Sequence, residues 1–174
     1  MFLELLRPLV HEHLTIHDAT ASKTLSSPVS DIRAYPERPY LAVSAAIIRD
    51  GKVLIVRRAR PPAQDLFTLP GGAVETGERL TEAVMREVRE ETQLEIEPVA
   101  LAGFREVIVR DESGRIERHF VVLCFAARYV SGDPVPNEEL AEFRWMYPNE
   151  ITGLRTTEGL AEIVAEAIEK LGLA

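Results

Sequence analysis

Short apolar runs separated by turn signals follow one another along most of the chain. Residues 41–49 (LAVSAAIIR) and 52–58 (KVLIVRR) are rich in valine and isoleucine, and Asp50-Gly51 between them is typical of a two-residue hairpin turn. The apolar density of the second run predicts a central strand that is covered on both faces. Further strands are predicted at residues 94–106, 107–110, 118–130 and 143–147.

Two segments have helical spacing instead. Leu80, Val84 and Val88 recur every four residues, which predicts an amphipathic helix between the strands. Residues 157–171 also place their apolar side chains at helical intervals. Strands on either side of one helix, followed by a last helix, indicate a mixed sheet between helices, in an α/β or α+β fold. Phe67 and Phe104 are predicted to pack in the core of this fold; the alternative for each is that its ring stacks on a base.

The first of these helices has an acidic face. Glu87, Glu90 and Glu91 fall within an arc of about 100° on a helical wheel, where they repel one another. A hard divalent cation would relieve this repulsion, because oxygen ligands bind such ions well. Gly71-Gly72, just before the helix, allows a close backbone approach, and the Gly72 carbonyl adds a further oxygen. We predict a metal site at Gly72 and the three glutamates; the alternative is an acidic face that is only solvated.

The spacing of these residues favours the metal site. Gly72, Glu78, the stretch Arg86–Glu91 and Leu94 together resemble the Nudix box, the signature of the Nudix hydrolases. One position departs from the pattern: Gln93 stands where the family has a glycine, which closes the helix in a left-handed conformation that costs other residues roughly 1 kcal/mol. The resemblance implies an α/β/α sandwich, with the box helix on one face of a mixed sheet and the C-terminal helix on the other.

The glycine loop and the three glutamates together point to metal-assisted hydrolysis of a diphosphate. Mg²⁺ would neutralise the pyrophosphate and orient a water, and Mn²⁺ is a plausible substitute because it accepts similar ligands. The resemblance implies that Arg86 forms an ion pair that orients Glu78 or Glu90. The catalytic base is open: Glu90 or Glu91 would act directly, or a glutamate from a later loop would, for which we choose Glu139.

The resemblance also bounds the substrate. It implies a nucleoside diphosphate linked to another group, either ADP-ribose or a nucleotide sugar, or a (deoxy)nucleoside triphosphate. Many ADP-ribose enzymes of the family carry a proline about sixteen residues beyond the box, where this chain has Arg110. Arg57 and Arg58 end a strand near the site, and one of them should point inward and bind phosphate. The alternative function is a non-catalytic module that senses a nucleotide; such modules often lose box carboxylates, which this chain retains.

Composition adds a few exclusions. The chain has 174 residues and a net charge of −8, which disfavours binding to nucleic acid or to an anionic membrane. It has no apolar run of 18 residues or more, so we expect no transmembrane segment. A single cysteine, Cys124, fits a reducing cytoplasm. We divide the chain into an N-terminal extension, residues 1–39, and a Nudix domain, residues 40–174; a homodimer is compatible with the sequence.

Overall fold

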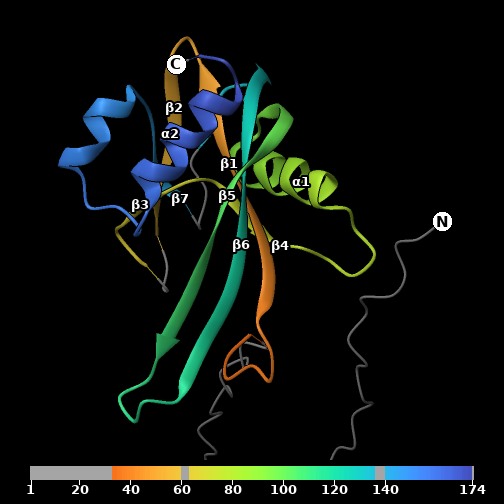
Figure 1. The fold of residues 1–174 in the computed structure, drawn as a ribbon, viewed down its shortest axis with the longest axis vertical. Coiled ribbons are helices and arrows are strands. Elements are labelled where there is room, and N and C mark those ends of the chain that lie inside the picture. The colour runs from red at the N-terminus through yellow and green to blue at the C-terminus, as the bar shows by residue number, and fades with distance from the viewer. Residues whose placement is uncertain (1–32, 60–62, 136–139, 174) are drawn as a thin grey trace, which may run out of the picture. The chain divides into compact units, whose positions relative to one another are not determined.

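Seven strands form one mixed sheet in the part of the chain that the structure, a computed structural model, describes: residues 33–59, 63–135 and 140–173 (Figure 1). The strands are β1 (Tyr40–Arg49), β2 (Lys52–Arg58), β3 (Phe67–Thr68), β4 (Gly71–Ala73), β5 (Glu95–Arg110), β6 (Ile116–Ser131) and β7 (Leu140–Met146). The helices are α1 (Leu80–Thr92), the short 3-10 helix η1 (Pro148–Gly153) and α2 (Leu160–Lys170).

The predicted hairpin joins β1 to β2. Asp50 and Gly51 both have positive φ angles, of 52° and 73°, as a two-residue turn with the twist of a hairpin requires. The strands pair antiparallel at the turn, and β2 lies between β1 and β7 with residues 53–56 fully buried. The predictions of the turn and of a central second strand are therefore confirmed.

The other edge of β1 pairs with β6 in parallel from Tyr40 to Ile48, and β6 pairs antiparallel with β5. The segments predicted as two strands, 94–106 and 107–110, form the single strand β5, which stays paired through several bulges. Within the described sheet β5 is an edge strand, with β6 as its neighbour. The long β5–β6 hairpin closes at a turn around Asp111, whose side chain accepts hydrogen bonds from the backbone of Ser113 and Arg115.

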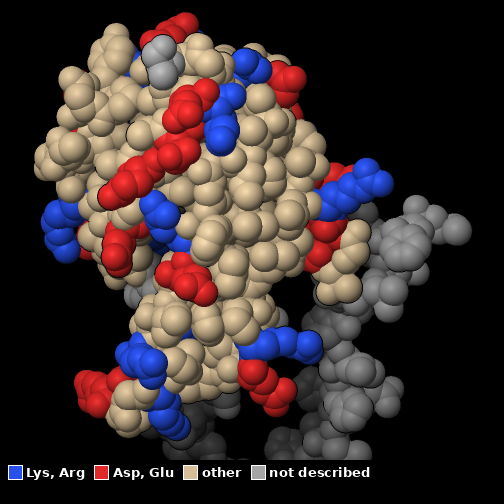
Figure 2. Space-filling view, viewed as in Figure 1, with Lys and Arg blue, Asp and Glu red and all other residues tan. Residues whose placement is uncertain are grey.

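Alternating side chains of the sheet build two cores. Ala46 and Ile48 of β1 pack with α2, whereas Ala45 and Ile47 pack with α1. The helices accordingly cover opposite faces of the sheet (Figure 1), so the α/β/α sandwich is confirmed. Acidic side chains follow the exposed side of α2 (Figure 2), where Glu162, Glu166 and Glu169 face solvent. Neither helix among the described residues is long and apolar enough to cross a membrane.

Candidate active site

The loop before α1 is built into the sheet. Gly71–Ala73 pairs antiparallel with the beginning of β1, with Gly72 opposite Val43. Gly71 has a φ of 149°, and a Cβ there would lie 2.1 Å from the Val43 carbonyl oxygen. A Cβ on Gly72 would lie 2.3 Å from the Glu87 Oε2 atom. Both positions therefore need glycine, the first to approach β1 and the second to let a carboxylate of α1 lie against the backbone.

Arg86 is the centre of an ion-pair network on α1. Its Nε and Nη2 atoms donate to the two carboxylate oxygens of Glu78 at 2.8 and 3.0 Å, and Nη2 also donates to the Ala73 carbonyl at 3.1 Å. Its Nη1 atom donates to Glu87 at 2.9 Å and to Glu90 at 3.2 Å. Arg86 thus contacts both of the glutamates proposed as its partners and a third. The Glu78 bonds, followed by Glu87, raise the pKa of Arg86, and Arg86 lowers the pKa of Glu78.

The three glutamates of the predicted metal site occupy distinct environments. Glu87 is partly buried; this burial raises the pKa of its carboxyl group, an effect that the Arg86 guanidinium opposes. Glu91 accepts a hydrogen bond of 2.8 Å from the Gly71 backbone N–H. Glu90 has the most exposed side chain of the network around Arg86, at 60%. Glu91 thus binds the backbone of β4, whereas Glu87 and Glu90 bind Arg86.

These residues fit a hard cation by their chemistry. Carboxylate oxygens are the ligands that Mg²⁺ prefers, and the Gly72 backbone approaches the Glu87 carboxylate without an intervening side chain. Over residues 33–59, 63–135 and 140–173, no three acidic, histidine or cysteine side chains converge as a ready-made metal site. Glu87 and Glu90 bind Arg86 instead, and Glu91 binds the Gly71 backbone. A metal ion would compete with these N–H groups for the same oxygens.

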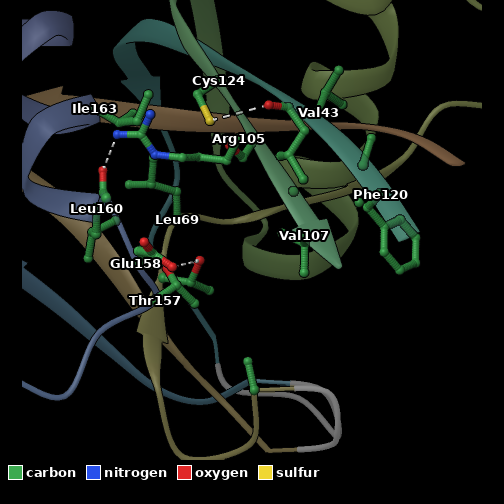
Figure 3. Close-up of a pocket in the computed structure, with 18 of the residues that line it drawn as sticks. Val43, Leu69, Arg105, Val107, Phe120, Cys124, Thr157, Glu158, Leu160 and Ile163 are labelled. Carbon is green, nitrogen blue, oxygen red and sulfur yellow. Dashed lines mark hydrogen bonds between the residues drawn. The ribbon is translucent and has the colours of Figure 1, made fainter. Parts of the chain in front are cut away.

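A cavity of about 380 Å³ opens beside this loop (Figure 3). Gly71 and Gly72 line one part of it, and the beginning of α2 lines another. Of the two arginines predicted to bind phosphate, Arg58 lines the cavity. Arg57 instead binds Asp65 at 3.2 Å and Glu142 at 2.9 Å. The structure thus places Arg58, rather than Arg57, in the cavity that the glycine loop also lines.

The predicted loop base, Glu139, lies outside the described residues. The nearby Glu142, on β7, accepts hydrogen bonds from Arg144 and Arg57, which lower the pKa of its carboxyl group. Arg144 also lies over the ring of Phe67, 4.7 Å from its centre. Glu142 therefore serves an ion-pair network between β2 and β7.

Another residue of the cavity, Arg105 on β5, had no signal in the sequence. Its neighbour Phe104 was predicted to pack in the core, as Phe67 does with 6% exposure. That prediction is wrong for Phe104, which is 57% exposed, because it lies on the edge strand β5. Alternation along β5 then directs Arg105 to the opposite face, where the cavity lies.

The structure is an α/β/α sandwich in which a glycine loop lines a cavity and also contacts an acidic helix, and this combination defines a class of domain. The family model described as "NUDIX domain" matches residues 38–167, and the chain belongs to this family.

Similar proteins agree with this assignment. The chain is 33% identical, over 67% of its length, to the ADP-ribose pyrophosphatase of Methanocaldococcus jannaschii, and the match covers 66% of that protein. It is 26% identical, over 87% of its length, to the NAD-capped RNA hydrolase NudC of Stutzerimonas stutzeri, of which it spans 51%. The crystal structure of a MutT NUDIX hydrolase from Burkholderia pseudomallei superimposes with a TM-score of 0.66 at 26% identity, covering 75% of this chain and 98% of that one. The chain therefore spans between half and two thirds of the length of the pyrophosphatase and of NudC.

Proposed function

We propose that this protein is a metal-dependent pyrophosphohydrolase that cleaves the diphosphate of a nucleotide derivative. The observation that carries the proposal is the contact of Gly72 with Glu87 at the edge of the cavity, with Arg86 fixing the surrounding carboxylates. We place the diphosphate of the substrate at Gly72, because this residue lines the cavity and also lies against the Glu87 carboxylate. The membership of the NUDIX family supports this reading.

The residues take separate roles in this proposal. Glu87, Glu90, Glu91 and the Gly72 carbonyl would hold Mg²⁺, or Mn²⁺ in its place. When bound, the ion supplies charge neutralisation at the diphosphate and lowers the pKa of a water. Arg86, which binds Glu78 with two parallel hydrogen bonds, positions the carboxylates next to it.

The proton of the attacking water needs an acceptor. Of the three α1 glutamates, Glu90 is classed as exposed, whereas Glu87 and Glu91 are partly buried, so Glu90 is the most accessible to water. We therefore favour Glu90 as the base among the described residues. Glu91 is held by the Gly71 N–H, and Glu139 stays a prediction from the sequence.

The substrate class follows from charge and similarity. Arg33, Arg58, Arg105 and Arg118 line the cavity of a chain whose net charge is −8, so the cavity suits an anionic molecule. Similarity to an ADP-ribose pyrophosphatase and to an NAD-capped RNA hydrolase supports a nucleotide derivative. ADP-ribose or a nucleotide sugar and a (deoxy)nucleoside triphosphate both remain candidates.

A substrate panel with two charge-removing variants tests the proposal. ADP-ribose, UDP-glucose, ATP and dGTP would each be incubated with Mg²⁺ or Mn²⁺, and release of the nucleoside monophosphate measured. Glu90→Gln and Glu91→Gln should each lower kcat/KM by about 10- to 100-fold or more, because a metal ligand is weakened. Glu166→Gln, on the exposed side of α2, is the matched control and should retain wild-type activity.

Two results would contradict this function. Wild-type activity in both Glu90→Gln and Glu91→Gln would exclude them as metal ligands. Tight nucleotide binding by the wild-type protein without turnover of any substrate would favour a nucleotide-sensing module instead.

A further inference from the structure

Arg105 is fixed in the cavity by two backbone carbonyl groups. Its Nη2 atom donates to the Gly159 carbonyl at 2.8 Å, and its Nη1 atom donates to the Phe104 carbonyl at 3.1 Å. Gly159 has a φ of 72°, and a Cβ there would lie 2.1 Å from the Arg105 Nε atom. The guanidinium is therefore wedged against the residue that precedes α2 (Figure 3).

The hydrogen bonds leave a defined set of donors. A guanidinium has five N–H groups, and the Nε group of Arg105 is buried and has no hydrogen-bond partner among the described residues. One N–H of Nη2 is bonded to the Gly159 carbonyl and one N–H of Nη1 to the Phe104 carbonyl, which leaves one N–H on each of these two nitrogens. Both bonds of Arg105 to described residues go to neutral carbonyls, whereas Arg57 and Arg86 bind carboxylates. Arg105 thus presents a positive fork with two donors.

The position of this fork suits the nucleoside end of a substrate. Strand pairing connects Arg105 to Val122, Val122 to Ala42, and Ala42 to Ala73, next to Gly72. Three strand spacings place the backbone of Arg105 about 14 Å from the glycine loop. The diphosphate belongs at the loop, so Arg105 meets the part of the substrate that lies farther along the cavity.

The walls near Arg105 are largely apolar. Val107, Phe120, Val122, Leu160 and Ile163 line the same cavity. Apolar walls with a few placed polar groups are typical of sites for flat organic rings. The exposed Glu158 lines the same cavity and offers an acceptor there (Figure 3).

We propose that Arg105 determines base specificity by donating to O6 and N7 of a 6-oxopurine, so that guanine and hypoxanthine nucleotides are preferred over adenine nucleotides. Two adjacent acceptors on the base match the two remaining donors of the fork. Adenine places an amino group at position 6, where it would oppose these donors with another donor. Glu158 provides an acceptor for N1–H, which 6-oxopurines carry and adenine lacks. The inference rests on the proposed function for its diphosphate site, and it names the base of that substrate.

Inosine and adenosine nucleotides test the inference, because their bases differ at position 6 and at N1, where Arg105 and Glu158 would bind. The kcat/KM values for ITP and ATP would be compared with Mg²⁺, and the binding of IMP and AMP would be measured by calorimetry. The wild-type protein should prefer the inosine form by about 10- to 100-fold in each measurement. Arg105→Met should reduce this preference to about threefold or less, because both donors are lost. Arg105→Lys should lose the preference as well, because an ammonium group lacks the two parallel donors of a guanidinium.

The controls separate the base contact from other effects. Arg110→Met changes another β5 arginine, which binds the Gly114 carbonyl on the exposed turn, and should keep the wild-type preference. Equal binding and turnover of the two forms by the wild-type protein would overturn the inference, as would an equal loss for both forms in Arg105→Met. Calorimetry needs no turnover, so a preference for IMP that Arg105→Met abolishes would support the inference even if no substrate were hydrolysed.

Discussion

The substitution Gly72→Ala isolates the contact on which the proposed site depends. An added Cβ would lie 2.3 Å from Oε2, 2.5 Å from Cδ and 2.7 Å from Oε1 of Glu87. Ordinary van der Waals contact begins near 3.4 Å, so the nearest oxygen must retreat from 2.3 Å by about 1.1 Å. The atoms in contact are the end of a flexible side chain, which makes room by rotating. The substitution should therefore move a metal ligand while leaving the fold in place.

The two expected magnitudes differ sharply. Misplacing a catalytic group by about 1 Å lowers activity on the order of 100-fold, equivalent to about 2.7 kcal/mol of transition-state stabilisation. The free energy of unfolding should change by no more than about 1 kcal/mol, because alanine also restricts the unfolded chain. Activity should thus fall far more than stability.

Titration of activity with Mg²⁺ and unfolding in urea would measure these quantities side by side. Gly153→Ala is the matched control, since a Cβ at Gly153 meets no atom within 4 Å and its φ is not in the left-handed region. It should leave both activity and Mg²⁺ dependence at wild-type values. If Gly72→Ala kept full activity at every Mg²⁺ concentration, Glu87 would not be a functional ligand. A stability loss of several kcal/mol would instead mean that the backbone, not Glu87, had moved.

Three further outcomes are expected. Gly71→Ala should prevent stable folding, seen as loss of the cooperative urea transition, because its Cβ would meet the backbone oxygen of Val43 at a φ of 149°; a normal transition would contradict this. Arg86→Met should destabilise the protein at pH 7, and the difference from wild type should shrink as the pH falls. Arg86 lowers the pKa of Glu78, so this stabilisation is present above the unfolded pKa, about 4.3, and is lost as the pH falls through the folded value; a pH-independent difference in urea unfolding would refute it. Gln93→Gly should raise the free energy of unfolding by up to about 1 kcal/mol, and with it the melting temperature, because Gln93 has a φ of 61°. An unchanged or lower melting temperature would count against strain at this residue.

Features set by local sequence were predictable. The turn at Asp50-Gly51 follows from the conformational preferences of these two residues. The left-handed end of α1 at Gln93 was implied by the resemblance to the Nudix box, because glutamine itself does not favour this conformation. The acidic face of α1 followed from helical spacing, but its ion pairs with Glu78 required the loop before the helix to fold back over Arg86. The sequence does not fix such contacts, because they depend on the path of the loop.

Strand order was the main feature that local patterns did not contain. The exposure of Phe104 depends on β5 being an edge strand, which is set by its pairing with β6 and not by its own residues. The same pairing places Arg105 beside Gly159, 54 residues away in the chain. A strand of mixed apolar and charged residues looks alike at the edge and at the centre of a sheet, so the cavity residue Arg105 could be found only in the folded chain.

The pairing of β4 with β1 has a thermodynamic consequence for ligand binding. The hydrogen bonds from Ala45 N–H to the Pro70 carbonyl and from Val74 N–H to the Leu41 carbonyl, of 3.0 and 3.1 Å, hold the backbone on both sides of Gly72. The loop is thus ordered by the folding of the sheet, and an arriving ion or nucleotide has little backbone entropy left to remove. Amide protons of this segment should accordingly exchange with solvent as slowly in the free protein as in its complexes, and the conformational entropy lost on binding should come from side chains rather than from this backbone.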